Sequence, residues 1–290
     1  MTTVKSKNVF NIAVKGTFDD CQNIVKKLFI DENLNSQLRL GSINSINWTR
    51  IMAQISYYIF SYNKVKEEYK NKKVSFCVPT GNFGDAFAGY IAREKFNVPI
   101  NKIIIATNKN NILDRFFKTG IYKKEKVYQT MSPSMDIQIA SNFERLLYDL
   151  YNQNGNIIND LMNDFSKNGI IKVNNKSFKK TKKIFLSFSI NEKETMNSIL
   201  HAYKKNQIIV DPHTAVGLEA SRKFIKKNKN DIVITLATAH ASKFSKAVST
   251  VLGFNPDFPQ NYKNIFKLNE KFIILENSYE QIKNYIVKNT

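Results

Sequence analysis

Cysteine is scarce in this sequence of 290 residues, which contains only Cys21 and Cys77. Two cysteines so far apart in the chain form neither a disulfide framework nor the clustered ligand set of a metal site. We therefore expect no bound metal, and a reducing, cytoplasmic compartment is the expected location.

Long apolar runs are missing as well. No uninterrupted apolar stretch approaches the about eighteen residues that a membrane-spanning helix needs, and residues 1–7 lack the apolar core of a signal peptide. The sequence thus predicts no membrane partner. With 42% hydrophobic and 12% aromatic residues, the composition is that of a chain able to bury a sizeable core.

Acidic residues are the minority among the charges: 24 Asp and Glu stand against 44 Lys and Arg, a net charge of +20. Such an excess can indicate nucleic-acid binding, because lysines and arginines displace counterions from a phosphate backbone. Here the lysines are scattered among Asn and Ile, and no recognition helix, RNA-binding strand pattern or zinc finger accompanies them. Nucleic-acid binding is the least favoured function, and no nucleic acid is expected as a partner.

A strand, a glycine turn and a helix are predicted in succession over residues 74–90. The apolar run Val74–Val78 ends at Pro79, and the letters TGNFGD follow at 80–85. In that geometry the backbone N–H groups of 81–84 can point at an anion in front of the helix. Gly81 and Gly84 are expected to provide positive φ angles and close approach to that anion.

The spacing of the two glycines is not specific by itself. It matches neither the G-x-G-x-x-G of dinucleotide sites nor the G-x-x-x-x-G-K-[ST] of nucleotide-phosphate loops. An ordinary tight turn without a ligand remains an alternative to the phosphate-binding interpretation.

The remaining pattern predicts an α/β fold with an open, mostly parallel sheet and helices on both faces. Short apolar or alternating runs predict the strands, and apolar residues at helical spacing predict the segments between them. The expected strands cover residues 9–14, 74–78, 102–108, 208–210 and 232–236. The expected helices cover 19–29, 47–62, 112–120, 140–151, 192–204 and 212–227.

Three stretches carry a resemblance to a known family. They read GSINSINWTRIMAQ at 41–54, PTGNFGD at 79–85 and TAHASKF at 238–244. In content and order they resemble the threonine synthases, which use pyridoxal 5′-phosphate (PLP) on the fold type II, or tryptophan-synthase-β-like, architecture. The resemblance implies a PLP site made by Thr80, Gly81, Asn82, Phe83, Gly84 and Asp85 at the phosphate, with Thr238 beside the pyridine nitrogen.

A second set of polar residues precedes the long amphipathic helix that begins near Asn47. Neutral amides and one guanidinium at a helix start can hold a second phosphate, here that of the substrate. The candidate substrate-binding residues are Asn44, Ser45, Asn47 and Arg50. Helix capping and ordinary surface polarity explain the same residues about as well.

The reaction implied by the resemblance converts O-phospho-L-homoserine and water to L-threonine and phosphate. The Schiff-base lysine motif of the family, His-Gly-Pro-Thr-x-x-Phe-Lys-Asp, and its Ser-Gly-Asp-Thr-Gly loop do not occur in these 290 residues. The chain therefore resembles roughly the last three-fifths of a threonine synthase, with Met1 an internal methionine. We expect no catalytic residue here, no activity alone, and the missing N-terminal portion as a partner. A non-catalytic α/β module that binds phosphate is the alternative.

The sequence also predicts two domains and the roles of two residues, His213 and Lys243. Residues 1–46 are interpreted as the remnant of a smaller N-terminal domain, and 47–290 as the larger PLP-phosphate-binding domain with a polar Lys/Asn-rich insertion near 152–183. His213 follows the expected strand 208–210 and can line a cleft, although a capping or structural role is favoured. Lys243 is expected on the surface or at a helix start, not as the Schiff-base lysine.

Overall fold

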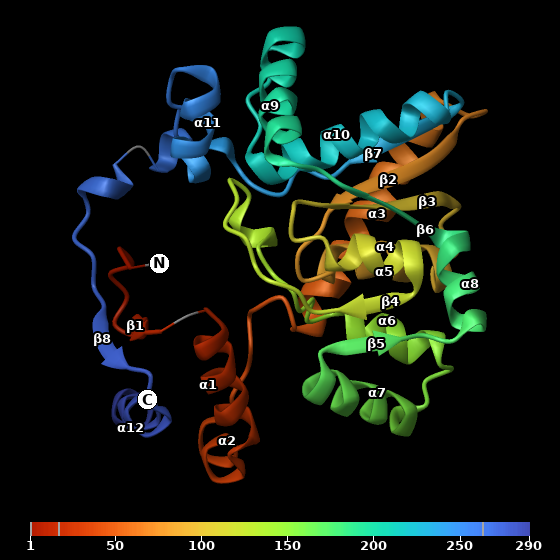
Figure 1. Ribbon diagram of the computed structural model, residues 1–290. Coiled ribbons are helices and arrows are strands. Elements are labelled where there is room, and N and C mark those ends of the chain that lie inside the picture. The colour runs from red at the N-terminus through yellow and green to blue at the C-terminus, as the bar shows by residue number, and fades with distance from the viewer. Residues whose placement is uncertain (1, 17, 263) are drawn as a thin grey trace. The chain divides into compact units, whose positions relative to one another are not determined.

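The computed structural model describes residues 2–16, 18–262 and 264–290, and these divide into two compact units (Figure 1). Unit 1 combines Met1–Ser42 with Phe258–Thr290, and unit 2 is Ile43–Asp257. Met1, expected to be an internal methionine of a longer protein, lies outside the described residues.

Unit 1 is a small α/β assembly of the two chain ends. The strands β1 (Ile12–Lys15) and β8 (Ile273–Glu276) pair in parallel, with Ile12 opposite Ile273. Their helices are α1 (Phe18–Ile30), α2 (Glu32–Leu38) and α12 (Tyr279–Asn289), with short 3-10 turns at Gln260–Tyr262 and Ile265–Lys267. The core comprises Ile24, Leu28, Leu34 and Ile282.

The observed division differs from the expected domains at the carboxyl end. The boundary between residues 42 and 43 lies near the expected one at 46, whereas 258–290 group with the first unit. The pairing of β1 with β8 is the physical reason, since it joins strands from opposite ends of the chain. Such a pairing leaves no local signal in either segment.

The centre of unit 2 is a four-stranded parallel sheet in the order β6-β3-β2-β7. The strands are β2 (Lys73–Pro79), β3 (Ile100–Thr107), β6 (Phe185–Ser189) and β7 (Asp231–Thr235). Along β3, Ile103 and Ile105 belong to one apolar cluster, and Ile104 and Ala106 belong to another. This alternation buries the sheet on both faces.

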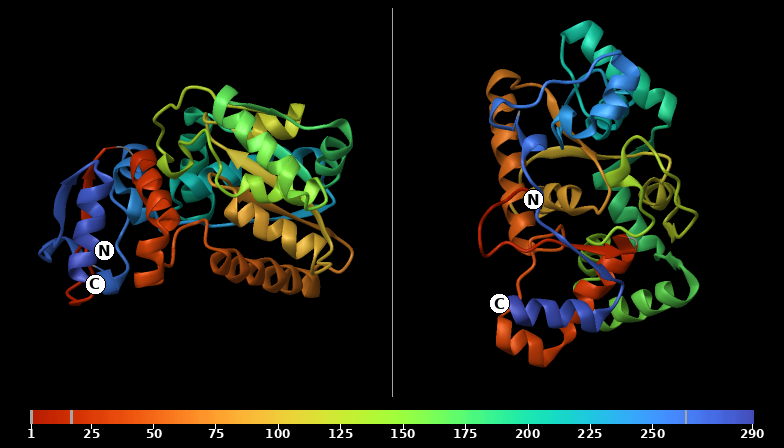
Figure 2. Two further views of the ribbon diagram at one scale, coloured as in Figure 1. Left: turned by 90° about the horizontal axis from the view of Figure 1, so that it is seen from below. Right: turned by 90° about the vertical axis from the view of Figure 1, so that its left-hand side faces the viewer.

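Different helices cover the two faces of this sheet. One cluster includes residues of α3 (Trp48–Glu68), α4 (Gly84–Glu94), α5 (Ile112–Thr119) and α6 (Phe143–Leu150). The other includes residues of α10 (Pro212–Lys227), which packs on α9 (Glu192–Asn206). Figure 2 shows α3 and α4 side by side on their face. The predicted fold class is confirmed.

One expected strand was wrong. Residues 208–210 connect α9 to α10 without joining the sheet, and Ile208 is exposed. The fourth strand is β6, which directly follows the lysine-rich α8 (Asn175–Ile184). The strand prediction failed because an apolar run of only three residues is too short to distinguish a strand from a connecting segment.

The Lys/Asn-rich segment 152–183 is more ordered than the expected polar insertion. It contains α7 (Gly155–Asn168) and β5 (Ile170–Lys172), and it leads into α8. The strand β5 pairs antiparallel with β4 (Ile121–Lys123). The side chains of Ile158, Phe165 and Ile171 are buried in the cluster that covers the sheet. All lysines of the segment except the half-buried Lys180 are exposed, while its apolar side chains contribute to the core.

The long amphipathic helix predicted from Asn47 is α3, capped by Asn47 itself. Ile51, Ile55, Tyr58 and Tyr62 are buried, while Trp48 and Met52 at its start remain exposed. The remaining elements of unit 2 are α11 (Ser245–Leu252) and the 3-10 turns η1 (Pro133–Met135) and η2 (Ala241–Phe244). No helix within the described ranges is long and apolar enough to cross a membrane.

Candidate functional site

The glycine loop 80–85 leaves the sheet at the carboxyl end of β2, where open α/β sheets place their ligands. Thr80 continues the sheet by donating its N–H to the carbonyl of Ala106, 2.8 Å away. The Thr80 hydroxyl donates back to the carbonyl of Val78 at 2.6 Å, so it is turned toward the strand. The helix α4 then begins at Gly84.

The left-handed residue of this loop is Phe83, with φ of 64°, and neither Gly81 nor Gly84 has a positive φ. The expectation of positive φ at the two glycines was therefore wrong. The Phe83 side chain is buried and its ring lies about 6 Å from those of Phe117, Phe143 and Phe185. These contacts hold a backbone conformation that costs on the order of 1–3 kcal/mol for a residue other than glycine.

Close packing explains the two glycines instead. A Cβ added at Gly81 would lie 2.6 Å from the backbone oxygen of Ser134, and one added at Gly84 would lie 3.2 Å from Nδ2 of Asn142. Glycine lets the loop approach two other segments that any side chain would displace.

A cavity of about 150 Å³ opens at this end of the sheet. It is lined by Pro79, Gly81, Asn82, Ser134, Met135, His213, Thr238, Ala239, Lys243 and Phe244. Three of the predicted cofactor-binding residues, Gly81, Asn82 and Thr238, thus share one cavity. Ser134, Met135 and Phe244 had not been predicted, although the polar turn that contains Ser134 is visible in the sequence.

A buried polar network fixes the turn that carries Ser134. Oδ1 of Asp136 accepts hydrogen bonds from the side chains of Asn108, Asn110 and Thr130, all at 2.7–2.8 Å. Asn108 follows the end of β3 and also donates to the hydroxyl of Ser132. The turn that carries Ser134 is therefore attached to the carboxyl end of β3, an internal strand of the sheet.

The other predicted cofactor-binding residues, Thr80, Phe83, Gly84 and Asp85, are not among those that line the cavity. The first N–H groups of α4 have no acceptor within the helix, as at every helix start. Burial raises the pKa of the Asp85 carboxyl to about 6, although a hydrogen bond from Tyr58 opposes that rise.

Local hydrogen bonds occupy the predicted substrate-binding stretch. Asn44 accepts from the N–H of Ile46 and Asn47 from that of Thr49, at 2.9 and 2.8 Å. Arg50 donates to the carbonyl of Ile43 at 3.0 Å. These are the caps and turns of the alternative interpretation, and none of the four candidates lines the cavity.

Asn142 joins this stretch to the glycine loop, a link that the sequence pattern did not assign. Its fully buried amide donates to the carbonyls of Ser45 and Asn82, at 2.8 and 3.2 Å. Its backbone N–H also donates to Asn82, and its Oδ1 accepts from Nε of Arg145. The two predicted phosphate-binding regions are thereby held next to each other.

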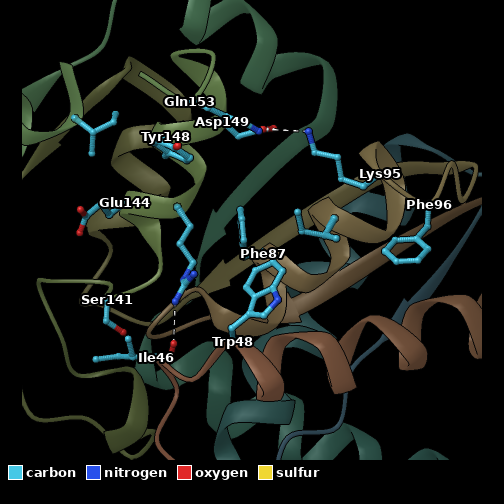
Figure 3. Close-up of a pocket in the computed structure, with 13 residues that line it drawn as sticks. Ile46, Trp48, Phe87, Lys95, Phe96, Ser141, Glu144, Tyr148, Asp149 and Gln153 are labelled. Atoms are coloured by element: carbon cyan, nitrogen blue, oxygen red, sulfur yellow. Dashed lines mark hydrogen bonds and ion pairs between the residues drawn. The ribbon is translucent and has the colours of Figure 1, made fainter. Parts of the chain in front are cut away.

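A larger pocket of about 750 Å³ is lined in part by Ile46 and Trp48 of the 44–50 stretch (Figure 3). It is lined by Ile46, Trp48, Phe87, Ile91, Lys95, Phe96, Ser141, Glu144, Arg145, Tyr148, Asp149, Gln153 and Ile158. Arg145 donates to the carbonyl of Ile46 there, at 2.9 Å, and its guanidinium lies over the Trp48 ring. The size of this pocket does not make it the predicted site, because none of the predicted residues lines it.

Known proteins resemble the chain over its whole length. Residues 214–286 match the family model described as "Threonine synthase, C-terminal". The chain is 39% identical to a threonine synthase of Pseudomonas aeruginosa and 42% identical to one of Saccharomyces cerevisiae, covering 99% of this chain and 60% of each relative.

The chain is similar in sequence to threonine synthases, and residues 214–286 match the carboxyl-terminal model of that family.

Solved threonine synthase structures are similar to this chain in fold as well. A PLP-bound enzyme from Brucella melitensis matches with a TM-score of 0.89 at 37% identity, and the yeast enzyme with 0.88 at 40%. Both matches cover all of this chain and 61% of the other. The chain thus spans about 60% of the length of its threonine synthase relatives.

Gly81→Ala tests the contact between the glycine loop and Ser134. The added Cβ meets a backbone oxygen at 2.6 Å, so one of two backbones must shift. We expect a loss of about 1–2 kcal/mol in the free energy of unfolding, as for other overpacked sites. Chemical denaturation measures it, with Gly155→Ala as the matched control because nothing lies within 4 Å of its added Cβ. Equal stabilities of the two variants would contradict the close approach.

Proposed function

We propose that this chain forms the part of a threonine synthase that holds the phosphate and the pyridine nitrogen of PLP. The observation that carries the proposal is the cavity shared by Gly81, Asn82 and Thr238 at the carboxyl end of the parallel sheet. A helix N-terminus adjoins it, which favours a phosphate through unpaired N–H groups and the helix dipole.

The residues around this cavity fit the cofactor. Without a Cβ, Gly81 leaves room for the loop to lie against Ser134, and the backbone there can donate to phosphate oxygens. In this proposal Asn82, Phe83, Gly84 and Asp85 contribute backbone N–H groups, and Thr80 fixes the loop to the sheet. The hydroxyl of Thr238 hydrogen-bonds the ring nitrogen. When bound, PLP supplies the electron sink that stabilises carbanions of the amino-acid substrate.

For the substrate, we propose that Asn44, Ser45, Asn47 and Arg50 hold the phosphate of O-phospho-L-homoserine. The bonds from Asn142 support this assignment, because they keep Ser45 beside Asn82 of the glycine loop. A guanidinium and amides at the start of α3 provide the charge and the donors that a phosphate requires.

The complete reaction in this proposal is that of O-phospho-L-homoserine with water to give L-threonine and phosphate, as a PLP-dependent lyase in threonine biosynthesis in the cytoplasm. These 290 residues contain no Schiff-base lysine motif. We therefore propose that catalysis requires a lysine-bearing segment like that of the threonine synthases, and that this chain alone is inactive.

Binding of 4′-deoxypyridoxine 5′-phosphate tests the cofactor site directly. This analogue keeps the phosphate and the ring nitrogen but lacks the aldehyde, so it cannot react with the many surface lysines. We expect saturable binding at one site by calorimetry. Thr238→Val removes one proposed hydrogen bond and Gly81→Ala pushes the loop away from Ser134, so each should weaken binding about five- to thirtyfold, equivalent to about 1–2 kcal/mol. An affinity that neither substitution changes would show that the analogue binds at another site.

An assay of phosphate release distinguishes the proposed threonine synthase function from the alternative, a non-catalytic module that binds phosphate. The chain is mixed with the lysine-bearing N-terminal segment of the yeast threonine synthase, and phosphate is measured after addition of O-phospho-L-homoserine. We expect release only when both are present with PLP. Analogue binding without any release in the mixture would favour the module.

A further inference from the structure

One buried carboxylate is linked through His213 and Thr214 to two residues that line the candidate cofactor cavity, Ser134 and Thr238. Asp211 is 1% exposed and caps α10, with its Oδ1 accepting the N–H of His213 at 2.9 Å. Nδ1 of the His213 ring lies 2.8 Å from the same oxygen, and the hydroxyl of Thr214 donates to the other, Oδ2. A side chain used only as a cap needs none of these additional partners.

The ring of His213 connects Asp211 to Ser134. Its Nε2 accepts the backbone N–H of Ser134 at 3.1 Å. A backbone N–H can only donate, so Nε2 carries a lone pair and the proton resides on Nδ1, where it is donated to Asp211. The phenyl ring of Phe244 packs against the imidazole, with a centroid distance of 4.6 Å.

Thr214 connects the same carboxylate to Thr238. Its hydroxyl oxygen, while donating to Asp211, accepts the backbone N–H of Thr238 at 3.2 Å. The carbonyl oxygen of Ser134 lies close to Gly81, and Ser134, Gly81 and Thr238 all line the cavity. The pairing of β2 with β7 sets how far Thr238 lies from the glycine loop, and the Asp211 carboxylate adds a link between Thr238 and the turn that carries Ser134.

We propose that Asp211, His213 and Thr214 are positioning residues that link Ser134 and Thr238 at the cavity, and that His213 acts as a neutral hydrogen-bond acceptor for Ser134. The proposal rests on the proposed function for the identity of the ligand. Although His213 lines the cavity, both of its ring nitrogens are committed to protein partners. It is therefore not the acid or base of the reaction.

A pair of substitutions separates this role from simple packing. In His213→Gln the side-chain oxygen can reach the position of Nε2 and accept from Ser134. In His213→Asn the shorter amide reaches only the position of Nδ1 and keeps the contact with Asp211. Both variants lose the imidazole that packs on Phe244, so that loss cancels in the comparison.

The readouts are the tautomer, the exchange of one amide and the affinity for the analogue. The chain has three histidines, so nitrogen-15 NMR of histidine-labelled protein can resolve the His213 ring. We expect the Nδ1–H form in the ligand-free 290-residue chain and slow exchange of the Ser134 amide. His213→Asn should speed that exchange at least about tenfold and weaken 4′-deoxypyridoxine 5′-phosphate binding by about three- to tenfold, the range for one lost hydrogen bond. His213→Gln keeps the acceptor for Ser134 but loses the contact with Asp211, so on both measures it should lie between the parent and His213→Asn.

An Nε2–H ring in the parent chain overturns the proposal, as does equal behaviour of the two variants. If either variant fails to fold, the tautomer and the Ser134 amide protection of the parent still decide. If the parent folds but does not bind the analogue, the cofactor assignment fails, while the two ligand-free measurements continue to test the positioning role.

Discussion

Asp85→Asn is expected to raise the free energy of unfolding at pH 7 by about 2 kcal/mol. Burial raises the pKa of this carboxyl from 3.8 to about 6, against an opposing hydrogen bond from Tyr58. At neutral pH the folded state therefore keeps a charge in a site that favours the neutral acid, at a cost of up to about 3 kcal/mol for a shift of this size. Asn keeps a similar shape without that charge, and the lost attraction of Asp85 to the start of α4 subtracts about 0.5 kcal/mol.

The free energy of unfolding of the parent chain should depend on pH because the pKa of Asp85 is raised in the folded state. A raised pKa means that the folded state binds the proton more tightly than the unfolded state. The parent chain is therefore expected to lose stability as pH rises from about 4 to about 6, and the Asn variant is expected to lack this part of the slope. At pH 4 the two should differ by less than about 0.5 kcal/mol, because the carboxyl is then protonated in the folded state.

Urea unfolding of both chains between pH 4 and pH 7 measures the difference. Asp149→Asn is the matched control, because hydrogen bonds from Tyr90 and Lys95 outweigh burial and lower the pKa of that carboxyl. Its removal should reduce stability at pH 7, the opposite sign. A parallel change in the two variants would show that Asp85 is not held in a site that disfavours its charge.

The sequence was sufficient where the structural cause is local. The buried strand at Val74–Val78, the turn after it and the delivery of Thr238 by the strand Ile232–Leu236 all follow from runs of neighbouring residues. The turn after β2 and the residues after β7 lie at the same end of the sheet because the carboxyl ends of parallel strands lie together. This is why Gly81, Asn82 and Thr238 could be predicted together.

Where the cause is a contact between distant segments, the sequence was insufficient. The left-handed angle at Phe83 depends on three aromatic rings far along the chain, and glycine was the reasonable expectation by local rules. Likewise, glycine is needed at position 81 because the backbone of Ser134 lies close to it, and the sequence of the loop does not indicate that contact. The His213 tautomer also depends on Ser134, a partner 79 residues away in sequence.

Asn142→Asp is expected to lower the free energy of unfolding at pH 7 by about 3–5 kcal/mol, the largest effect of any substitution considered. The amide that donates to the carbonyls of Ser45 and Asn82 becomes an oxygen facing two other oxygens in a fully buried position. An uncompensated buried charge carries a cost of that order. Arg145 offsets only part of it, because its Nε already bonds the other oxygen, Oδ1.

Asn142→Ala measures how much stability is lost with the amide donors alone, without the added charge of the Asp variant. It leaves the carbonyls of Ser45 and Asn82 without this donor, and it should cost about 2–3 kcal/mol. The extra loss in the Asp variant should shrink below about pH 5, where a protonated acid can donate again. Asn175→Asp makes the same chemical change at the exposed first residue of α8 and should change stability by no more than about 0.5 kcal/mol.

Binding of the phosphorylated analogue adds a functional measure to these variants. Asn142 holds the 44–50 stretch against the glycine loop, so its loss should loosen Asn82, which lines the cavity. We expect calorimetry on folded Asn142→Ala, below its unfolding transition, to show an affinity at least about tenfold weaker, a change of about 1.4 kcal/mol. An unchanged affinity in a destabilised variant would mean that Asn142 supports the fold alone, and that the two predicted phosphate-binding regions act independently.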